Sequence, residues 1–338
     1  MSLPNFSSAV LAATAPAPQR RAIAKAITLL ESTRPDHRAQ ADELLAALLP
    51  HTGKAFRLGI SGVPGVGKST FIEILGLYLI KQGHRVAVLT IDPSSTVSGG
   101  SILGDKTRME NLSVHERAYI RPSPSSGTLG GVAEKTREAL LVCEAAGYDV
   151  VIVETVGVGQ SETAVASMTD MFVLMQLPNA GDDLQAIKKG VMELADIVII
   201  NKSDIDPIAA QRAQLQITSA MQLLGMFSGY VESNWHPKAL QLSALKGQGV
   251  DVFWTAVLDF KARQTANGKF DTRRQQQSLA WMWERIDAGL KHAFKHNPAV
   301  SALLPTLVAQ VATGQLAAST AARNLLDAQL NTAYIAIK

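Results

Sequence analysis

Eight consecutive residues, Gly62-Val-Pro-Gly-Val-Gly-Lys68-Ser69, have the types and spacing of a phosphate-binding loop. They match the pattern G-x-x-x-x-G-K-[ST] and lie between a strand-like run, 57–60, and a helix-like run, 70–81. Glycines let the backbone curve until successive N–H groups point at one anion, and the positive end of the following helix strengthens the attraction. The Lys68 ammonium can reach the β- and γ-phosphates, and the Ser69 hydroxyl can bind Mg²⁺. The residues expected to contact a bound nucleotide here are Gly62, Val63, Pro64, Gly65, Val66, Gly67, Lys68, Ser69 and Thr70.

A second element has the features expected of a partner for the metal ion. Asp149-Val-Val-Ile-Val-Glu154 is an apolar run that ends in a carboxylate, the Walker B arrangement with Glu in place of the commoner Asp. The Gly-rich residues that follow predict a loop beside the γ-phosphate, in which Gly157 offers a backbone N–H and the loop tightens with triphosphate. Gln160 can orient the attacking water, or it can be a solvent-facing loop amide. We expect Lys68, Glu154 and Gln160 to take part in catalysis.

Two further aspartates are candidates for the Mg²⁺ shell. Asp92 follows the apolar run 85–91, and the carboxyl end of a strand is a favourable place from which to reach the metal. Asp105 lies in a Gly/Ser-rich stretch, where an aspartate more often forms a turn.

The base is indicated by Asn201-Lys202-Ser203-Asp204, which follows the apolar run 196–200 and matches N-K-x-D. An ionised Asp204 accepts hydrogen bonds from the ring N–H and the exocyclic amine of guanine, whereas adenine lacks this pair of donors. Lys202 can lie along the base, and Asn201 can join neighbouring loops. After the last strand-like run, a backbone amide of Ser243-Ala244-Leu245 can meet the guanine carbonyl. We therefore expect GTP and GDP rather than ATP.

The elements that must position these residues are short apolar runs that alternate with helix-length segments. This pattern predicts an α/β fold, a P-loop NTPase with a mainly parallel sheet flanked by helices. Residues 1–18 are expected to be a frayed tail, and 19–49 two helices broken around Arg34-Pro35. Beyond residue 261 we expect only helices, over 275–296 and 300–330. The expected strands are 56–60, 85–91, 149–153, 171–177, 196–200 and 239–242. The expected domains are an N-terminal helical extension, 1–53, the P-loop GTPase domain, 54–262, and a C-terminal helical arm, 263–338.

Composition excludes several classes of partner. Net charge is +3 without a dense Lys/Arg run, so nucleic acid is not expected. No apolar run approaches the roughly 18 residues needed to cross a bilayer, and the N-terminal charges follow the apolar part, the wrong order for a secretory signal. The single cysteine, Cys143, lies in an apolar stretch and suits a small buried side chain in a reducing compartment. We expect a cytoplasmic protein.

Longer strings resemble one family closely. GGSILGDKTRM (99–109), IRPSPSSGTLGG (120–131), CEAAGYDVVIVETVGVGQ (143–160), GDDLQAIKKG (181–190) and the N-K-S-D motif are similar to those of the methylmalonyl-CoA mutase-associated GTPases, the MeaB/ArgK family. The resemblance implies a GTPase domain with helical extensions at both ends and a homodimer formed by the C-terminal one. It implies Mg²⁺ bound through Ser69, Asp92, Asp105 and Glu154, and a mobile loop whose Asp182 and Lys188 signal to a partner.

The partner that this resemblance implies is the adenosylcobalamin-dependent methylmalonyl-CoA mutase. The expected role is chaperoning, in which GTP binding and weak hydrolysis gate cofactor loading and the removal of inactivated cofactor.

Three alternatives stay open on sequence grounds. A metal-insertion GTPase would carry His tracts or Cys pairs, and only His292 and His296, four apart on one helix, approach that pattern. An ATPase or kinase linked to lysine, arginine and ornithine transport would need ATP, against which the N-K-S-D motif speaks. A dimeric scaffold that binds GTP without hydrolysing it is the third.

Overall fold

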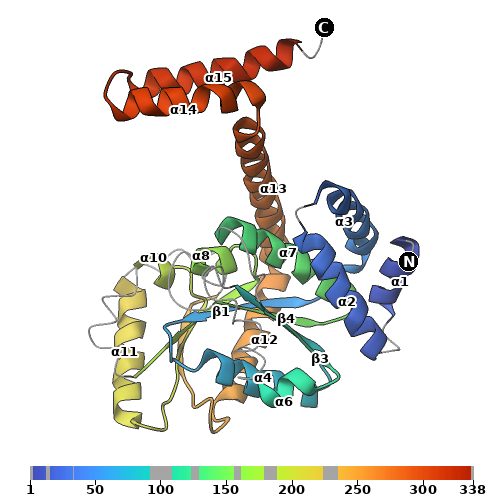
Figure 1. Ribbon diagram of the computed structural model, residues 1–338. Coiled ribbons are helices and arrows are strands. Elements are labelled where there is room, and N and C mark those ends of the chain that lie inside the picture. The colour runs from blue at the N-terminus through green and yellow to red at the C-terminus, as the bar shows by residue number, and fades with distance from the viewer. Residues whose placement is uncertain are drawn as a thin grey trace. The chain divides into compact units, whose positions relative to one another are not determined.

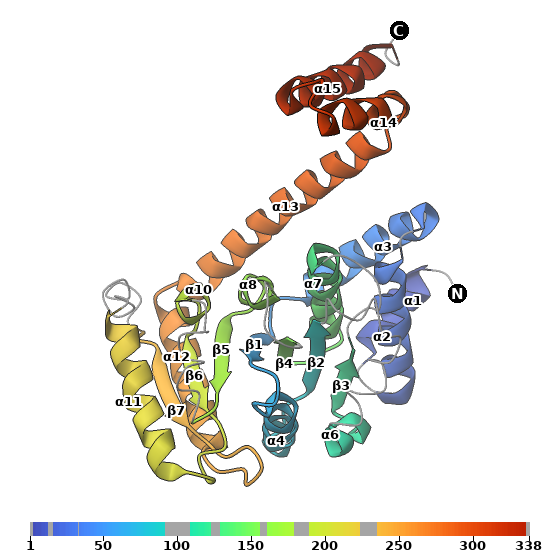
Figure 2. The same ribbon diagram turned by 60° about the vertical axis from the view of Figure 1, so that its left-hand side comes forward.

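The fold is organised around one seven-stranded sheet whose strands are all parallel. The computed structural model describes residues 3–12, 16–32, 34–91, 109–122, 129–155, 161–178, 189–223 and 235–335 (Figure 1). The strands follow the order β3-β2-β4-β1-β5-β6-β7 across the sheet (Figure 2). The predicted α/β class and parallel sheet are confirmed. The strands are β1 (Phe56–Gly62), β2 (Val86–Ile91), β3 (Ala118–Arg121), β4 (Val150–Thr155), β5 (Met171–Gln176), β6 (Ile197–Ile200) and β7 (Lys238–Gln241).

Helices cover both faces of this sheet, which is why β2, β4, β5 and β6 are buried along their whole length. One face packs on α4 (Lys68–Lys81), α6 (Glu110–Val114) and α12 (Val250–Ala266). The opposite face packs on α7 (Leu129–Ala145), α8 (Ser161–Ala166), α10 (Lys189–Met192) and α11 (Pro207–Leu223). Alternate residues of each strand enter the two cores; in β4, Ile152 belongs to the α4 face and Val153 to the α7 face.

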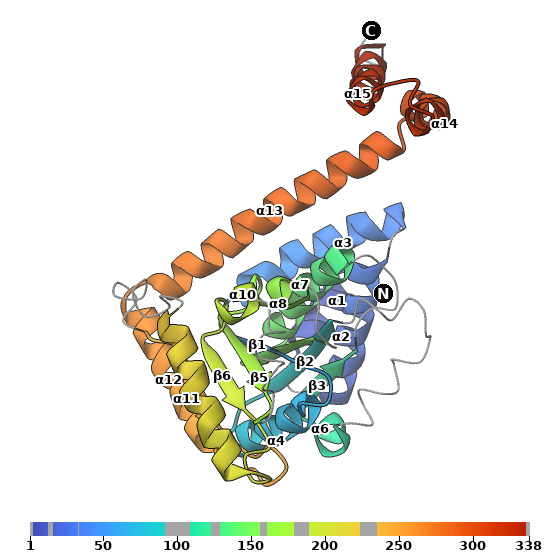
Figure 3. The ribbon, with the colours of Figure 1, turned by 90° about the vertical axis from the view of Figure 1, so that its left-hand side faces the viewer.

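The N-terminal residues form three helices that pack beside α7 (Figures 1 and 3). They are α1 (Leu3–Leu11), α2 (Pro16–Glu31) and α3 (Pro35–Leu48), followed by a short 3₁₀ turn, η1 (Leu49–His51). The predicted break at Arg34-Pro35 is present, but the predicted frayed tail is wrong. Val10 of α1 is fully buried, and the buried Gln19 amide of α2 donates to the carbonyl oxygens of Val10, at 2.8 Å, and Ala146, at 3.0 Å.

The chain divides into two compact units, residues 1–274 and 275–338. The predicted boundaries at 53/54 and 262/263 stay predictions. Three helices occupy the end of the chain, α13 (Lys269–Lys295), α14 (Pro298–Ala312) and α15 (Ala318–Ile335). The expected single helix over 300–330 is wrong, because Gly314 takes a left-handed φ of 72° between α14 and α15.

Sequence reasoning missed β3. This strand has only four residues and lies at the edge of the sheet, where Tyr119 and Arg121 interrupt the apolar character that marked the other strands. Among the described residues, no helix combines the length and the apolar character required to cross a membrane.

Candidate nucleotide-binding site

The phosphate-binding loop joins the end of β1 to the start of α4, at the carboxyl edge of the central strand. At two positions of the loop, neighbouring atoms lie so close to the backbone that only glycine fits. A Cβ on Gly62, with φ 155°, would lie 2.5 Å from the Met175 carbonyl oxygen of β5. A Cβ on Gly67, with φ 95°, would lie 2.6 Å from the Asn201 side-chain nitrogen. The loop is therefore packed against both β5 and the N-K-S-D segment, and side chains at these positions would push it away.

The Lys68 side chain turns back toward the start of the phosphate loop. Its ammonium donates to the carbonyl oxygens of Gly62 at 2.6 Å and Val63 at 3.3 Å. The first helical hydrogen bond of α4 runs from the Phe71 amide to the Gly67 carbonyl at 2.9 Å. The preceding amides, including those of the half-buried Ser69 and Thr70, lie at a helix N-terminus, which favours an anion. This geometry suits the phosphate tail of a nucleotide.

The predicted Walker B carboxylate lies beside this loop in the sheet. Glu154 is paired in register with Ile60 of β1 and with Thr90 of β2, and it is only 2% exposed. The Thr90 hydroxyl donates to Glu154 Oε1 at 3.2 Å. One residue further along each strand, the buried hydroxyls of Ser61 and Thr155 are 2.8 Å apart. Buried carboxylate and hydroxyl oxygens are ligands that suit Mg²⁺.

Asn201 joins three loops at the other side of the phosphate site. Its buried amide donates to the Val66 carbonyl at 2.7 Å and accepts from the Ala244 amide at 3.0 Å. Lys202 adopts a left-handed φ of 60°, and its ammonium donates to the Gly65 carbonyl at 2.9 Å. A positive φ in a non-glycine residue is a strained conformation that surrounding contacts must hold. The side chains of Asn201 and Lys202 thus bond the N-K-S-D loop to the phosphate loop.

Asp204 follows on the same loop, and its environment keeps it ionised. The Ser243 hydroxyl hydrogen-bonds to it, and the Lys246 ammonium lies 3.3 Å from its Oδ2. These two contacts, the hydroxyl first, hold the pKa of the Asp204 carboxyl below its usual value. Ser243 and Ala244 are buried, whereas Leu245 is 81% exposed at the tip of the turn closed by the Ser243–Gln248 bridge. An ionised carboxylate at this place can accept two hydrogen bonds from a guanine.

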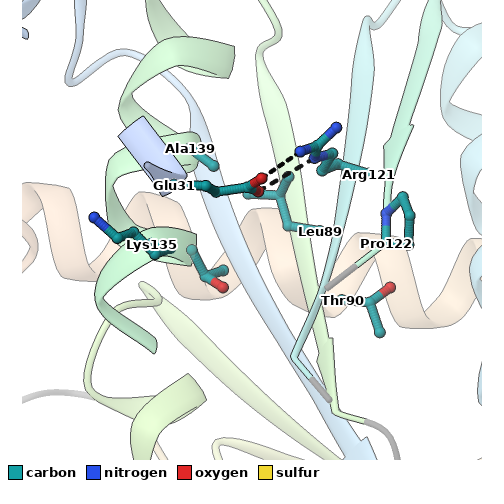
Figure 4. A pocket seen from close by; sticks show the side chains of 8 residues that line it. Glu31, Leu89, Thr90, Arg121, Pro122, Lys135 and Ala139 are labelled. Carbon is teal, nitrogen blue, oxygen red and sulfur yellow. Dashed lines mark hydrogen bonds and ion pairs between the residues drawn. The ribbon is translucent and has the colours of Figure 1, made fainter. Parts of the chain in front are cut away.

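A small hollow lies in another part of the fold, and of the residues described above only Thr90 contributes to its lining. It lies between the N-terminal helices and the sheet, where Arg121 of β3 makes two contacts to the Glu31 carboxylate of α2 (Figure 4). The Lys135 side chain points away from that ion pair in Figure 4 and donates to the Leu30 carbonyl. The hollow therefore belongs to the junction with the N-terminal helices.

Several predicted site residues lie outside the described residues. They are Asp92, Asp105, Gly157, Gln160, Asp182 and Lys188. Conversely, sequence reasoning did not single out Thr90 or Lys246 for the site. Thr90 could have been suspected from its place at the end of a strand. Lys246 follows Ser243-Ala244-Leu245 directly, but its pairing with Asp204 depends on how two loops meet.

A phosphate loop, a buried carboxylate on the neighbouring strand and an N-K-x-D loop bonded to the phosphate loop together define a P-loop GTPase. Comparison with known proteins identifies the family. The family described as "Methylmalonyl Co-A mutase-associated GTPase MeaB" matches residues 23–299, and the chain belongs to it.

The relatives agree with this assignment. A "Putative GTPase" of Caulobacter vibrioides is 55% identical over 309 residues, covering 91% of this chain and 94% of the relative. "GTPase ArgK" of Escherichia coli is 50% identical over 283 residues, covering 82% and 84%. The solved "LAO/AO transport system kinase" has 38% identity and a TM-score of 0.75 and covers 96% of both chains. The protein is a GTPase of the MeaB family, as the resemblance predicted.

Proposed function

We propose that this GTPase is a chaperone of adenosylcobalamin-dependent methylmalonyl-CoA mutase, gating cofactor loading and the removal of inactivated cofactor. The observation that carries the proposal is the family match, which spans residues 23–299 and so includes the whole nucleotide site. The site supports it because a chaperone of this kind needs a nucleotide switch. We place the protein in the cytoplasm.

Each part of the site has a separate task in the proposed hydrolysis. Ser69, Asp92, Asp105 and Glu154 hold Mg²⁺, which when bound neutralises charge that develops on the phosphate oxygens. Lys68 and the loop amides orient the phosphate tail, Asp204 selects guanine, and Gln160 positions water. The described donors fit a hard cation, since Glu154 is a buried carboxylate and Ser69 a hydroxyl in the first turn of α4.

The output of the switch is a change in affinity for the mutase. Gly157 senses the γ-phosphate, and Asp182 and Lys188 carry the state of the nucleotide to the partner. A ligand shifts an equilibrium only through its different affinity for two states, so the GTP and GDP forms must bind the mutase differently.

The test is GTP turnover with and without the mutase. We expect slow intrinsic hydrolysis that the mutase accelerates, and cofactor transfer to the mutase that depends on the nucleotide. Lys68→Ala serves as the control that should lose both effects. Unchanged turnover together with nucleotide-independent transfer would reject the chaperone role while leaving the GTPase assignment intact.

A transport-linked kinase is the second candidate, because the solved relative carries the name of a transport system kinase. Competition between ATP and GTP for binding separates the two, since a kinase of that type would use ATP. A metal-insertion role has less support: no group of three metal-ligating side chains occurs in the described ranges. His292 and His296 stack with ring centroids 4.0 Å apart, and the Nδ1 atom of His296 is hydrogen-bonded to the His292 carbonyl.

We further propose a homodimer formed through the C-terminal unit. One stripe of α13 carries large apolar side chains at helical spacing, each between 39% and 61% exposed, and α13 buries none of its residues. Such a stripe is typical of a helix that packs against another chain. Its residues are Leu279, Met282, Trp283, Ile286 and Leu290.

A charge placed in this stripe is expected to dissociate the dimer. Trp283→Lys removes the largest apolar side chain and would bury an unpaired ammonium in the interface. Sedimentation at micromolar concentration should then show a monomer. Ala288→Lys, on the opposite side of the same helix, is the matched control and should remain dimeric. Equal masses for all three proteins would contradict an interface on this stripe.

A further inference from the structure

Thr90 and Glu154 form a buried contact between two strands at the edge of the sheet where the nucleotide site lies. They are direct register partners on β2 and β4, and each residue is 2% exposed. The Thr90 hydroxyl donates to Glu154 Oε1 at 3.2 Å. Because the two residues face each other on neighbouring parallel strands, the sheet itself holds this geometry. By the alternation of side chains along β2, Thr90 lies on the same side of the strand as Val86 and Val88, which belong to the core on the α4 side. Thr90 also contributes to the lining of the small hollow that Lys135 and Thr136 of α7 line.

The hydrogen bond from Thr90 limits the conformational freedom that a glutamate has at a Walker B position. A glutamate side chain has one more methylene and one more torsion than an aspartate. Its carboxylate therefore has more freedom, and holding it in one direction costs more conformational entropy. A hydrogen bond to Oε1 restrains the last torsion and limits the directions in which the carboxylate oxygens can meet a cation. Groups that orient a metal ligand in this way typically change metal affinity or activity 10- to 100-fold when removed.

We infer that Thr90 is a positioning residue for Mg²⁺ binding, acting through Glu154 to orient the carboxylate toward the metal. The inference rests on the proposed assignment of Glu154 as a Mg²⁺ ligand. Thr90 itself touches neither nucleotide nor metal in this role. Its loss should therefore change the dependence on Mg²⁺ while leaving metal-free nucleotide binding unchanged.

The test compares Thr90→Val and Thr90→Ser with the wild-type protein. Val keeps the shape of Thr without the donor, and Ser keeps the donor. In a first titration, the binding of a fluorescent GDP analogue is measured as Mg²⁺ is added. In a second, the rate of GTP hydrolysis is measured over the same range of Mg²⁺ concentrations. For Thr90→Val we expect the half-saturating Mg²⁺ concentration to rise about 10- to 100-fold, with GDP affinity in EDTA unchanged. Thr90→Ser should restore most of the wild-type Mg²⁺ dependence.

A matched control removes a similar hydrogen bond from Thr136, which lines the same hollow as Thr90 but does not bond to Glu154. Thr136 of α7 is also buried, and its hydroxyl donates to the Val132 carbonyl at 2.9 Å. Thr136→Val should leave the Mg²⁺ dependence at the wild-type value. A Thr90→Val protein indistinguishable from Thr136→Val in this titration would overturn the inference. So would a Thr90→Ser protein as defective as Thr90→Val, because packing rather than the hydroxyl would then explain the loss.

A double-mutant cycle between positions 90 and 154 provides a second test. Thr90→Ala takes the place of Thr90→Val in this cycle if Thr90→Val folds poorly. Glu154→Asp retracts the carboxylate by about 1.5 Å, one carbon–carbon bond, and so breaks its contact with Thr90. In this background, loss of the Thr90 hydroxyl should have little further effect on the Mg²⁺ dependence; an equal loss in both backgrounds refutes coupling. Glu154→Gln separates the two proposals. If Glu154→Gln keeps the normal Mg²⁺ dependence, the assignment of Glu154 as a metal ligand fails. If Glu154→Gln is defective in Mg²⁺ binding and Thr90→Val is not, the role of Thr90 is rejected and the metal assignment stands.

Discussion

Asp204→Asn is expected to transfer the preference of this GTPase from guanosine to xanthosine nucleotides. The wild-type carboxylate can accept from both N1–H and the exocyclic amine of guanine. An amide in its place presents one acceptor and one donor, which match the N1–H and the C2 carbonyl of xanthine. Sites that hydrogen-bond a specific group reject analogues lacking it by large factors, so GTP affinity should fall by up to about 10⁴-fold. Competition between GTP and XTP for a fluorescent nucleotide measures the change.

The structure explains why this substitution should act on the base alone. Asp204 is held by Ser243 and Lys246, and Asn201 rather than Asp204 bonds to the phosphate loop. The phosphate contacts should therefore survive in Asp204→Asn. Lys68→Ala is the comparison variant, which should weaken GTP and XTP binding alike. If Asp204→Asn keeps the wild-type ratio of GTP to XTP affinity, Asp204 does not read the base.

Replacing Arg274 by Met is expected to give the largest loss of stability of the changes considered. The Arg274 guanidinium makes a bidentate pair with Asp170, at 2.7 Å and 2.6 Å, and donates to the carbonyl oxygens of Gly53 and Ala55. The side chain of Asp170 is 1% exposed and that of Arg274 13%. Removing one partner of such a pair leaves a buried charge uncompensated and costs about 3–5 kcal/mol. Urea unfolding followed by circular dichroism measures the loss.

Two further variants identify the cause of that loss. Asp170→Asn in the Arg274→Met background removes the uncompensated charge, while an amide oxygen can still accept from the Arg57 amide, which lies 2.7 Å from Asp170 Oδ2. The double variant should therefore be more stable than Arg274→Met alone. The exposed Arg34–Asp36 pair is the control, and Arg34→Ala should leave the urea midpoint unchanged. A double variant as unstable as the single one would show that packing against Phe270, rather than charge, is decisive.

The same contacts affect where the chain can be shortened. Arg274 lies in the first turns of α13, yet its partners lie at the starts of β1 and β5. A chain that ends at residue 269 loses this pair, whereas one that ends a few residues after Arg274 keeps it. The helix pattern near residue 263 could not reveal this, because the pair joins residues 104 positions apart.

The amino-acid sequence by itself determined the class of the fold, six of the seven strands and the two motifs that indicate a guanine nucleotide. These features are local: a few adjacent residues define a phosphate loop, and a continuous apolar run defines a strand buried on both faces. Only the tertiary structure decided that Thr90 bonds to Glu154, that Lys246 pairs with Asp204 and that Arg274 closes on Asp170. The first depends on strand register, the second on the meeting of two loops and the third on a helix that reaches the start of a strand. The spacing of neighbouring residues in the sequence contains none of these.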